Sequence, residues 1–189
     1  MIISFPPYYN TILEDSKTLG FNMLSNEAAG QFLRTLAASK LSARILELGT
    51  GTGLGLTWLA DGADEQATIV SVESEMDFLQ VAKHHFLADA RIQFIHEDAA
   101  HFIQNYSGEA FDLIFADTWS GKYYDLAATL ALVKVGGFYV IDDMLPQPNW
   151  PEGHDLKAAQ LLNELQQRTD FHFSYLPVHT GLVLMTKKA

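Results

Sequence analysis

The stretch Glu47-Leu48-Gly49-Thr50-Gly51-Thr52-Gly53 decides the fold of this chain. It begins in an apolar run, residues 44–49, that is typical of a buried strand, and it leads into a helical pattern at residues 54–60. The three glycines permit a tight turn and let a ligand approach the backbone closely. The unpaired N–H groups at the start of the following helix favour an anionic group. The sequence therefore predicts a strand, a binding turn and a helix, in that order.

Strand and helix patterns continue to alternate outward from this turn. Further strands are predicted at residues 68–73, 91–96, 111–117 and 138–142. Helical spacing predicts helices at residues 26–40, 54–60, 76–88, 99–105, 123–133 and 155–168. Two strands without a helix between them, 171–176 and 181–187, predict a hairpin. The alternation predicts the α/β fold class, and the arrangement resembles the Rossmann-like fold of the class I methyltransferases. It has a mostly parallel seven-stranded sheet, helices on both faces and a C-terminal antiparallel hairpin strand.

Length and composition fit one domain over residues 1–189, with residues 1–25 as an N-terminal lid or loop segment that holds one helix. Cysteine is absent, which excludes disulfides and a cysteine nucleophile and agrees with a cytoplasmic location. The formal charge of −11 repels phosphate backbones, so we expect no nucleic-acid partner. We also expect no signal peptide and no membrane partner, because no apolar run reaches about 20 residues.

Acidic residues around the turn indicate which cofactor it binds. Glu73 ends the second strand, where a carboxylate can accept both ribose hydroxyl protons. The same geometry serves NAD, but Glu47 is awkward beside a pyrophosphate and suits a sulfonium ligand that carries an amino group. The sequence therefore predicts S-adenosylmethionine. Asp98 and Ala99 are expected near its adenine; Asp98 can instead, or in addition, cap the helix that starts at residue 99.

Further segments share one register along the chain. They are Met23 followed by GQFL at residues 30–33, FDLIFAD at 111–117, Tyr123, LVKVGG at 132–137 and IDD at 141–143. In this pattern, which covers residues 23–145, the chain resembles the cation-dependent O-methyltransferases of the caffeoyl-CoA and catechol type. The resemblance implies methylation of an oxygen on a small phenolic or catechol-like molecule by a homodimer. With the turn, it implies the cofactor contacts Met23, Glu47, Gly49, Thr50, Gly51, Gly53, Glu73, Asp98, Ala99 and Asp117.

Three aspartates follow two strands that are neighbours in this fold, Asp117 after one strand and Asp142 and Asp143 after the next. The resemblance implies that they bind Mg²⁺, Mn²⁺ or Ca²⁺. Such an ion would offset their repulsion and lower the pKa of the acceptor oxygen. The family has asparagine at the position of Asp143. The alternative is that the aspartates act separately, one contacting the cofactor or capping a helix and another facing solvent.

Asp117 and Lys122 are the predicted catalytic residues. The family usually has a lysine three residues after the first aspartate, where this chain has Ser120, so Lys122 is the candidate base in its place. The competing interpretation is that Lys122 is solvated, as lysines near a helix start usually are. Trp119 is expected either to stack on an aromatic acceptor or to pack beneath the lid.

Other functions stay open on the sequence alone. A metal-independent small-molecule methyltransferase and a non-catalytic protein that binds S-adenosylmethionine would have the same turn. An NAD-dependent oxidoreductase is more remote, because Tyr123 has Ala127 where the Tyr-x3-Lys pair of such enzymes has lysine.

Overall fold

The computed structural model describes residues 4–148 and 150–189 of the chain. The helices are α1 (Tyr9–Leu19), α2 (Glu27–Ala38), α3 (Leu54–Gly62), α4 (Met76–His85), α5 (Ala99–Asn105), α6 (Leu126–Ala131) and α7 (His154–Gln166). The strands are β1 (Arg44–Leu48), β2 (Thr68–Glu73), β3 (Ile92–His96), β4 (Phe111–Ala116), β5 (Val133–Ile141), β6 (Phe171–Leu176) and β7 (Leu182–Lys187).

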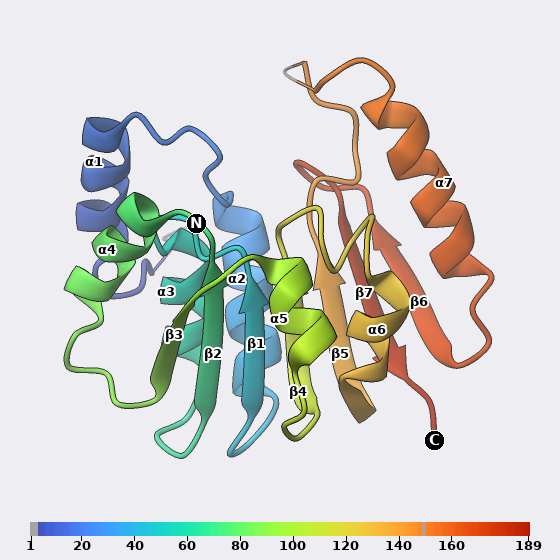
Figure 1. Ribbon diagram of the computed structural model, residues 1–189, viewed down its shortest axis with the longest axis horizontal. Coiled ribbons are helices and arrows are strands. Elements are labelled where there is room, and N and C mark those ends of the chain that lie inside the picture. Colours follow the sequence, from blue (N-terminus) through green and yellow to red (C-terminus); the bar gives the residue numbers. More distant parts are fainter. Residues whose placement is uncertain (1–3, 149) are drawn as a thin grey trace.

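The strands form one sheet in the order β3-β2-β1-β4-β5-β7-β6 (Figure 1). The first five strands are parallel to their neighbours, and β7 pairs antiparallel with both β5 and β6. The predicted class I methyltransferase sheet and its hairpin are thereby confirmed. The strand order reverses between β1 and β4, and ligands of open α/β sheets bind at such a point, beyond the carboxyl ends of the strands.

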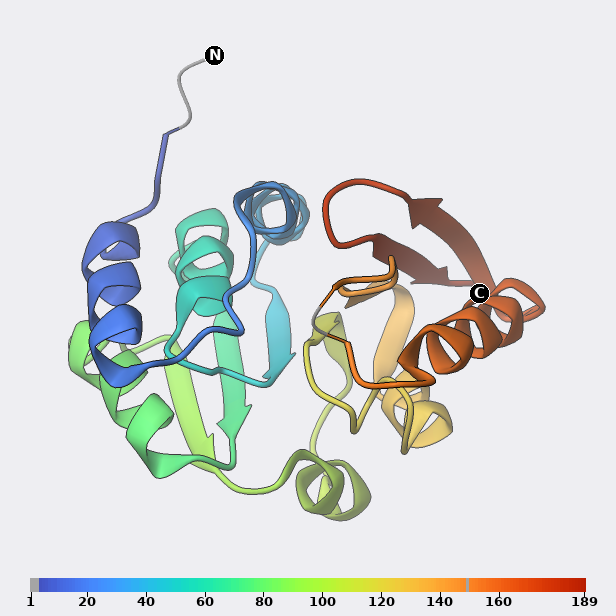
Figure 2. The ribbon, with the colours of Figure 1, turned by 90° about the horizontal axis from the view of Figure 1, so that it is seen from above.

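Helices cover both faces of the sheet because successive residues of each strand point to opposite sides. On β1, Ile45 belongs to a core formed with α1, α2 and α3, whereas Leu46 belongs to a second core formed with α5, α6 and α7. Figure 2 shows α2 and α3 on one side of the sheet and α5 and α7 on the other. Both cores leave the carboxyl edge of the sheet to the loops that carry the candidate site.

Two predicted elements after β4 are wrong in their bounds. The predicted helix at residues 123–133 begins only at Leu126, because Asp125 (φ 54°) is left-handed and a right-handed helix cannot include it. The strand predicted at 138–142 starts earlier, at Val133, and its pairing with β4 shifts register before Phe138. The glycines at 136 and 137 thus lie inside an irregular strand rather than ahead of it.

The N-terminal segment is more than a lid. Residues 1–3 lie outside the described residues, but α1 packs against α3 and α4, and its Tyr9 and Ile12 are buried. The part that lines the candidate site is the connection from Phe21 to Ser25. Within the described part of the chain, no helix combines the length and the apolar character needed to cross a membrane.

Candidate active site

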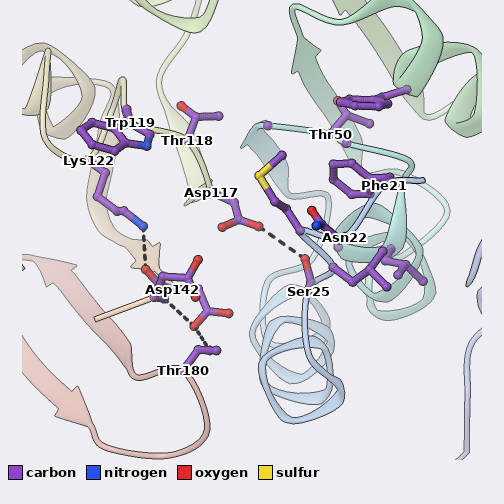
Figure 3. Close-up of a pocket in the computed structure, with 18 of the residues that line it drawn as sticks. Phe21, Asn22, Ser25, Thr50, Asp117, Thr118, Trp119, Lys122, Asp142 and Thr180 are labelled. Atoms are coloured by element: carbon purple, nitrogen blue, oxygen red, sulfur yellow. Dashed lines mark hydrogen bonds between the residues drawn. The ribbon is translucent and has the colours of Figure 1, made fainter. Parts of the chain in front are cut away.

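A cavity of about 660 Å³ lies at the carboxyl edge of the sheet. One side of its wall comes from residues 21–25, the glycine turn and the end of β2, which we call the glycine-turn half. The other side comes from the loops after β4 and β5 and from the start of α7, which we call the aspartate half. Figure 3 shows Thr50 and Phe21 on one side of Asp117, with Trp119 and Lys122 on the other.

Gly49 joins the two halves. Its φ of 96° is left-handed, and a Cβ atom there would lie 2.5 Å from Thr118 Cγ2 and 2.9 Å from the backbone oxygen of Asp117. Glycine is therefore required for two reasons, the backbone conformation and the close approach of the loop after β4. The N–H groups of Gly49 and Thr50 both donate to the backbone oxygen of Val72, at 2.9 and 3.1 Å.

The amides of the glycine turn are bonded within the protein, whereas the sequence predicted that N–H groups at the start of the following helix would attract an anionic group. Besides the two N–H groups bonded to Val72, the N–H of Gly51 donates to Glu73 Oε2 at 2.8 Å and the N–H of Gly53 donates to the backbone oxygen of Thr50 at 2.9 Å. These four donors fix the shape of the turn. An anionic group would meet the N-terminus of α3, the place expected from the sequence, whose first residues, Leu54 and Gly55, line the cavity.

Glu73 lies where the sequence predicted it, at the end of β2 on the cavity wall. Its Oε2 atom accepts the bond from Gly51, and its Oε1 atom accepts one from the N–H of Glu75 at 2.9 Å. Two backbone donors thus hold the carboxylate in one orientation. An ionised carboxylate has about four acceptor positions, so it can still accept hydroxyl protons.

Glu47 lies beneath the turn and does not line the cavity; its side chain is fully buried. Ser71 Oγ donates to Glu47 Oε2 at 2.5 Å, and Thr50 Oγ1 lies 2.5 Å from Ser71 Oγ. Glu47 Oε1 has no hydrogen-bond partner among the described residues. The pKa of Glu47 is raised to about 8. Burial is the main cause, the bond from Ser71 opposes it, and the charges of Asp117 and Glu73 add to the increase. Glu47 therefore supports the turn in its protonated form at neutral pH.

Three further predicted contacts, Gly53, Asp98 and Ala99, also lie outside the cavity wall. Asp98 Oδ1 accepts from the N–H groups of Ala100 and His101 at 2.9 and 3.2 Å, so Asp98 caps α5 as the alternative interpretation proposed.

Aromatic rings that the sequence did not single out line the glycine-turn half. The rings of Phe21 and Phe78 have their centroids 4.6 Å apart, and Phe21 lies directly over Gly51. Met23 also lines the cavity, with its side chain largely exposed.

Asp117 and Asp142 meet because β4 and β5 are parallel neighbours. Ala116 pairs with Ile141, so the residue after each strand lies at the same edge. The pKa of Asp117 is raised to about 7. Burial is the main cause, Lys122 opposes it, and the charges of Asp142 and Asp143 add to the increase. Ser25 Oγ donates to Asp117 Oδ2 at 3.4 Å (Figure 3).

The carboxylate of Asp142 is bonded to protein donors. It accepts from Thr180 Oγ1, from Asn26 Nδ2 at 3.3 Å and from the N–H of Asp143 at 2.7 Å. Burial raises its pKa, and the bonds from Thr180 and Asp143 lower it. Asn26 also caps α2 through its other side-chain atom, Oδ1. Asp142 thereby ties the start of α2 to the β6–β7 hairpin.

The predicted divalent-cation site does not fit this arrangement. Within residues 4–148 and 150–189, no group of three His, Asp or Glu side chains is placed to hold a metal ion. Asp117, Asp142 and Asp143 all line the cavity, but as the described residues are placed these three side chains do not form a group that would hold an ion. We therefore derive no chemical step through a metal ion.

Lys122 is buried, with 4% of its surface exposed, so the competing interpretation of a solvated lysine is wrong. Its Nζ atom donates to the backbone oxygen of Asp142 at 2.8 Å (Figure 3). The turn at residues 119–124 directs it inward: the N–H of Gly121 donates to the oxygen of Tyr124 at 2.7 Å, and Tyr139 Oη donates to the oxygen of Gly121 at 2.5 Å. Gly121, directly before Lys122, was the sequence signal for a turn rather than a helix at this position.

Aromatic side chains close the aspartate half of the cavity. The ring of Trp119 lies 5.4 Å from that of Tyr123, and the ring of Trp150 lies 4.3 Å from that of His154. Tyr123 Oη and His154 Nε2 are 3.0 Å apart. Burial raises the pKa of Tyr123 to about 12 and lowers the pKa of His154, so both are neutral at neutral pH. This half therefore offers flat, largely uncharged surfaces beside Asp117 and Lys122.

Comparison with known proteins agrees with this geometry. A family profile described as O-methyltransferase matches residues 10–188. The chain belongs to this O-methyltransferase family. Its catechol O-methyltransferase relative from Mycobacterium tuberculosis is 27% identical over 154 residues, which cover 72% of this chain and 69% of that protein. Relatives from Mycobacterium ulcerans and Mycobacterium marinum are 28% identical over 119 residues. This matched region is 60% of this chain, and it spans about half of their length (53%).

Solved O-methyltransferase structures share the fold over the whole chain. The O-methyltransferase TomG from Streptomyces achromogenes, in complex with SAM, superposes with a TM-score of 0.84 at 20% identity, covering 100% of this chain and 93% of that one. The O-methyltransferase from Bacillus cereus, in complex with SAH, gives a TM-score of 0.85 at 18% identity, covering 100% and 94%. The class I methyltransferase fold predicted from the sequence is confirmed.

Proposed function

We propose that this chain transfers a methyl group from S-adenosylmethionine to a hydroxyl oxygen of a small phenolic or catechol-like acceptor. The observation that carries the proposal is the shared cavity, in which the glycine turn and Glu73 lie opposite Asp117, Lys122 and Trp119. A cavity of about 660 Å³ is within the usual range for small-molecule sites. The catechol O-methyltransferase among the relatives supports the acceptor class.

The glycine-turn half holds the cofactor in this proposal. Bound S-adenosylmethionine supplies a methyl group activated by its sulfonium sulfur. Glu73 accepts hydrogen bonds from the ribose hydroxyls, and the N-terminus of α3 at Leu54 and Gly55 attracts the carboxylate. The Phe21 and Phe78 rings offer an apolar wall for the adenine. Glu47 acts from below by holding Ser71 and, through it, Thr50.

The aspartate half orients the acceptor and takes its proton. The Asp117 carboxylate lines the cavity and has one distant donor, Ser25, so it is available to accept the acceptor's hydroxyl proton. A pKa of about 7 suits a general base that works near neutral pH. The Trp119 ring supplies a flat surface on which an aromatic acceptor can stack. The homodimer implied by the family resemblance stays a prediction.

Calorimetric titration tests the cofactor assignment. S-adenosylmethionine is expected to bind the wild type, and NAD is not. Glu73→Ala should weaken S-adenosylmethionine binding by about 1–3 kcal/mol, the usual cost of losing hydrogen bonds to a charged group. Glu75→Ala is the matched control, because Glu75 contributes to the Glu73 bonds only through its backbone N–H. Unchanged affinity in Glu73→Ala would remove Glu73 from the ribose site, and binding of NAD instead would favour the oxidoreductase alternative.

A further inference from the structure

Lys122 places a positive charge in a wall rich in carboxylates. Glu73, Asp117, Asp142 and Asp143 all line the cavity, and among the described lining residues Lys122 is the only lysine or arginine. It lies close enough to lower the pKa of both Asp117 and Asp142 against the effect of burial. Lys122 therefore supplies charge compensation that the family resemblance assigned to a divalent ion.

The ammonium group is held in a fixed place. Its bond to the Asp142 backbone oxygen is 2.8 Å long, and Nζ lies 5.4 Å from the centroid of the Tyr123 ring. The backbone behind it is fixed by Gly121, where a Cβ atom would lie 2.6 Å from Leu48 Cδ1. An ammonium has three N–H donors, and within residues 4–148 and 150–189 only one of them is bonded. Two donors thus remain for a ligand in the cavity.

We propose that the Lys122 ammonium takes the place of the divalent cation: it binds the acceptor oxygen directly, and methyl transfer by this chain needs no metal ion. The inference rests on the proposed function and adds to it the group that stabilises the acceptor oxygen. Lys122 acts here as a hydrogen-bond donor, in contrast to the base that the sequence suggested, because its ammonium already donates to a carbonyl oxygen and faces carboxylates.

The transfer step balances without a further reactant. The acceptor hydroxyl gives its proton to the Asp117 carboxylate, and the negative charge that develops on the oxygen is stabilised by two N–H groups of Lys122. The oxygen then bonds to the methyl carbon while the carbon–sulfur bond breaks, and sulfur keeps that electron pair. Methylated acceptor and S-adenosylhomocysteine leave, and Asp117 loses its proton to solvent.

The first test concerns metal binding and needs no activity. MgCl₂ and MnCl₂ are titrated into the wild type, with binding heat and melting temperature measured at each concentration. The proposal expects no heat of specific ion binding and no rise in melting temperature. An ion that binds only the native state would raise the melting temperature by mass action. A rise that Asp117→Asn and Asp142→Asn abolish would overturn the proposal.

The second test measures transfer to catechol as formation of S-adenosylhomocysteine. Wild-type kcat should be the same with EDTA and with added MgCl₂. Lys122→Ala should lower kcat about 100-fold, as removal of an oxyanion donor does. Lys122→Arg should restore about a tenth of the wild-type rate, because it keeps the charge but not the shape of the donor. Lys17→Ala, on the exposed surface of α1, is the matched control and should behave as wild type.

The outcomes separate this inference from the proposed function. Loss of activity in EDTA with recovery in Mg²⁺ would overturn the role of Lys122 and leave the methyltransferase assignment standing. Absence of transfer to any catechol would refute the acceptor class, and the metal titration would still decide the cation. If Lys122→Ala fails to fold, Lys122→Gln, a neutral donor of nearly the same reach, replaces it. A Gln variant with full kcat would also contradict the proposal.

Discussion

Around Gly49 the cavity wall is made of backbone, whereas around Lys122 it is made of side chains. The glycine-turn half takes its shape from four turn amides that are bonded to neighbouring acceptors. The aspartate half takes its shape from residues that lie far apart in the sequence: Asn26, Asp142 and Thr180 form one hydrogen-bonded group. The comparison teaches that the first half depends on local conformation and the second on correct packing of the whole chain.

The largest expected effect comes from breaking the aspartate half at Asp117. Asp117→Asn removes the proposed general base and should lower kcat/KM by a factor of about 10²–10⁴. S-adenosylmethionine affinity should change little, because the amide has nearly the same size. In the wild type, kcat/KM should rise with pH up to about 7, since only the ionised carboxylate accepts a proton, and then level off. The variant should lose this rise.

A pH profile of kcat/KM checks this prediction, with calorimetry of S-adenosylmethionine binding as the control. If kcat/KM of Asp117→Asn stayed within about threefold of the wild-type value, Asp117 would not be the base. If S-adenosylmethionine affinity fell by the same factor as kcat/KM, Asp117 would serve cofactor binding as well as catalysis. The glycine-turn half and the aspartate half would then not be independent at this residue.

The glycine-turn half was predictable to the extent that backbone decides it. The spacing of Gly49, Gly51 and Gly53 behind an apolar strand indicated the turn, and Glu73 lies where predicted because it ends the next strand. The sequence could not predict which turn N–H groups are bonded within the protein, because their acceptors, Val72 and Glu73, lie beside the turn only in the folded sheet.

A second prediction tests the support below the turn at Glu47. Its carboxyl releases its proton near pH 4.5 in the unfolded chain and near pH 8 in the folded one, so the folded state binds one more proton between these values. Its contribution to stability is complete below about pH 4.5 and is lost as pH rises to about 8. Each pKa unit corresponds to about 1.4 kcal/mol, so the loss amounts to a few kcal/mol.

Glu47→Gln removes this titration and should flatten the stability curve between pH 5 and pH 8, measured by urea denaturation. Asp117 and Asp142 also have raised pKa values, so the test is the difference between wild type and variant at each pH. The amide oxygen can still accept from Ser71, which preserves the bond to the turn. Parallel curves for the two proteins would show that Glu47 is not protonated in the folded state.

The aspartate half was predictable only in part. The expected strand order predicted that Asp117 and Asp142 lie together. The structure agrees, because the residues before them, Ala116 and Ile141, are paired in the sheet. The competing interpretation of Lys122 as a solvated lysine rested on a helix start close behind it, at Tyr123. Two left-handed residues, Gly121 and Asp125, redirect the chain there. The partners of Asp142 come from α2 and from the β6–β7 hairpin, and no local pattern relates such distant segments.

A third prediction sharpens the comparison by testing the backbone alone. Gly49→Ala forces a left-handed conformation on alanine and a contact of 2.5 Å with Thr118, so it should destabilise the fold by about 2–3 kcal/mol and weaken S-adenosylmethionine binding. Gly136→Ala is the matched control: its φ is 73°, but no atom lies within 4 Å of the added Cβ. It should cost about 1 kcal/mol and leave binding intact. Equal binding losses in both variants would mean that strain, and not the contact at the turn, is responsible.

The smallest expected effect lies at the open end of the aspartate half. Trp119 is 42% exposed and lines the cavity, so its ring is available to an aromatic acceptor. Trp119→Ala should raise the KM for catechol about 2- to 10-fold, the equivalent of roughly 0.5–1.5 kcal/mol of aromatic contact, and should leave kcat and cofactor affinity unchanged. Trp119→Phe should recover most of this loss in KM.

Tyr124→Ala is the control, because the Tyr124 ring stacks on Trp119 at 6.1 Å but does not line the cavity. A lowered melting temperature with unchanged KM would assign Trp119 to packing beneath the lid, the other interpretation of its sequence. The acceptor specificity of this half would then depend on Tyr123, Trp150 and His154.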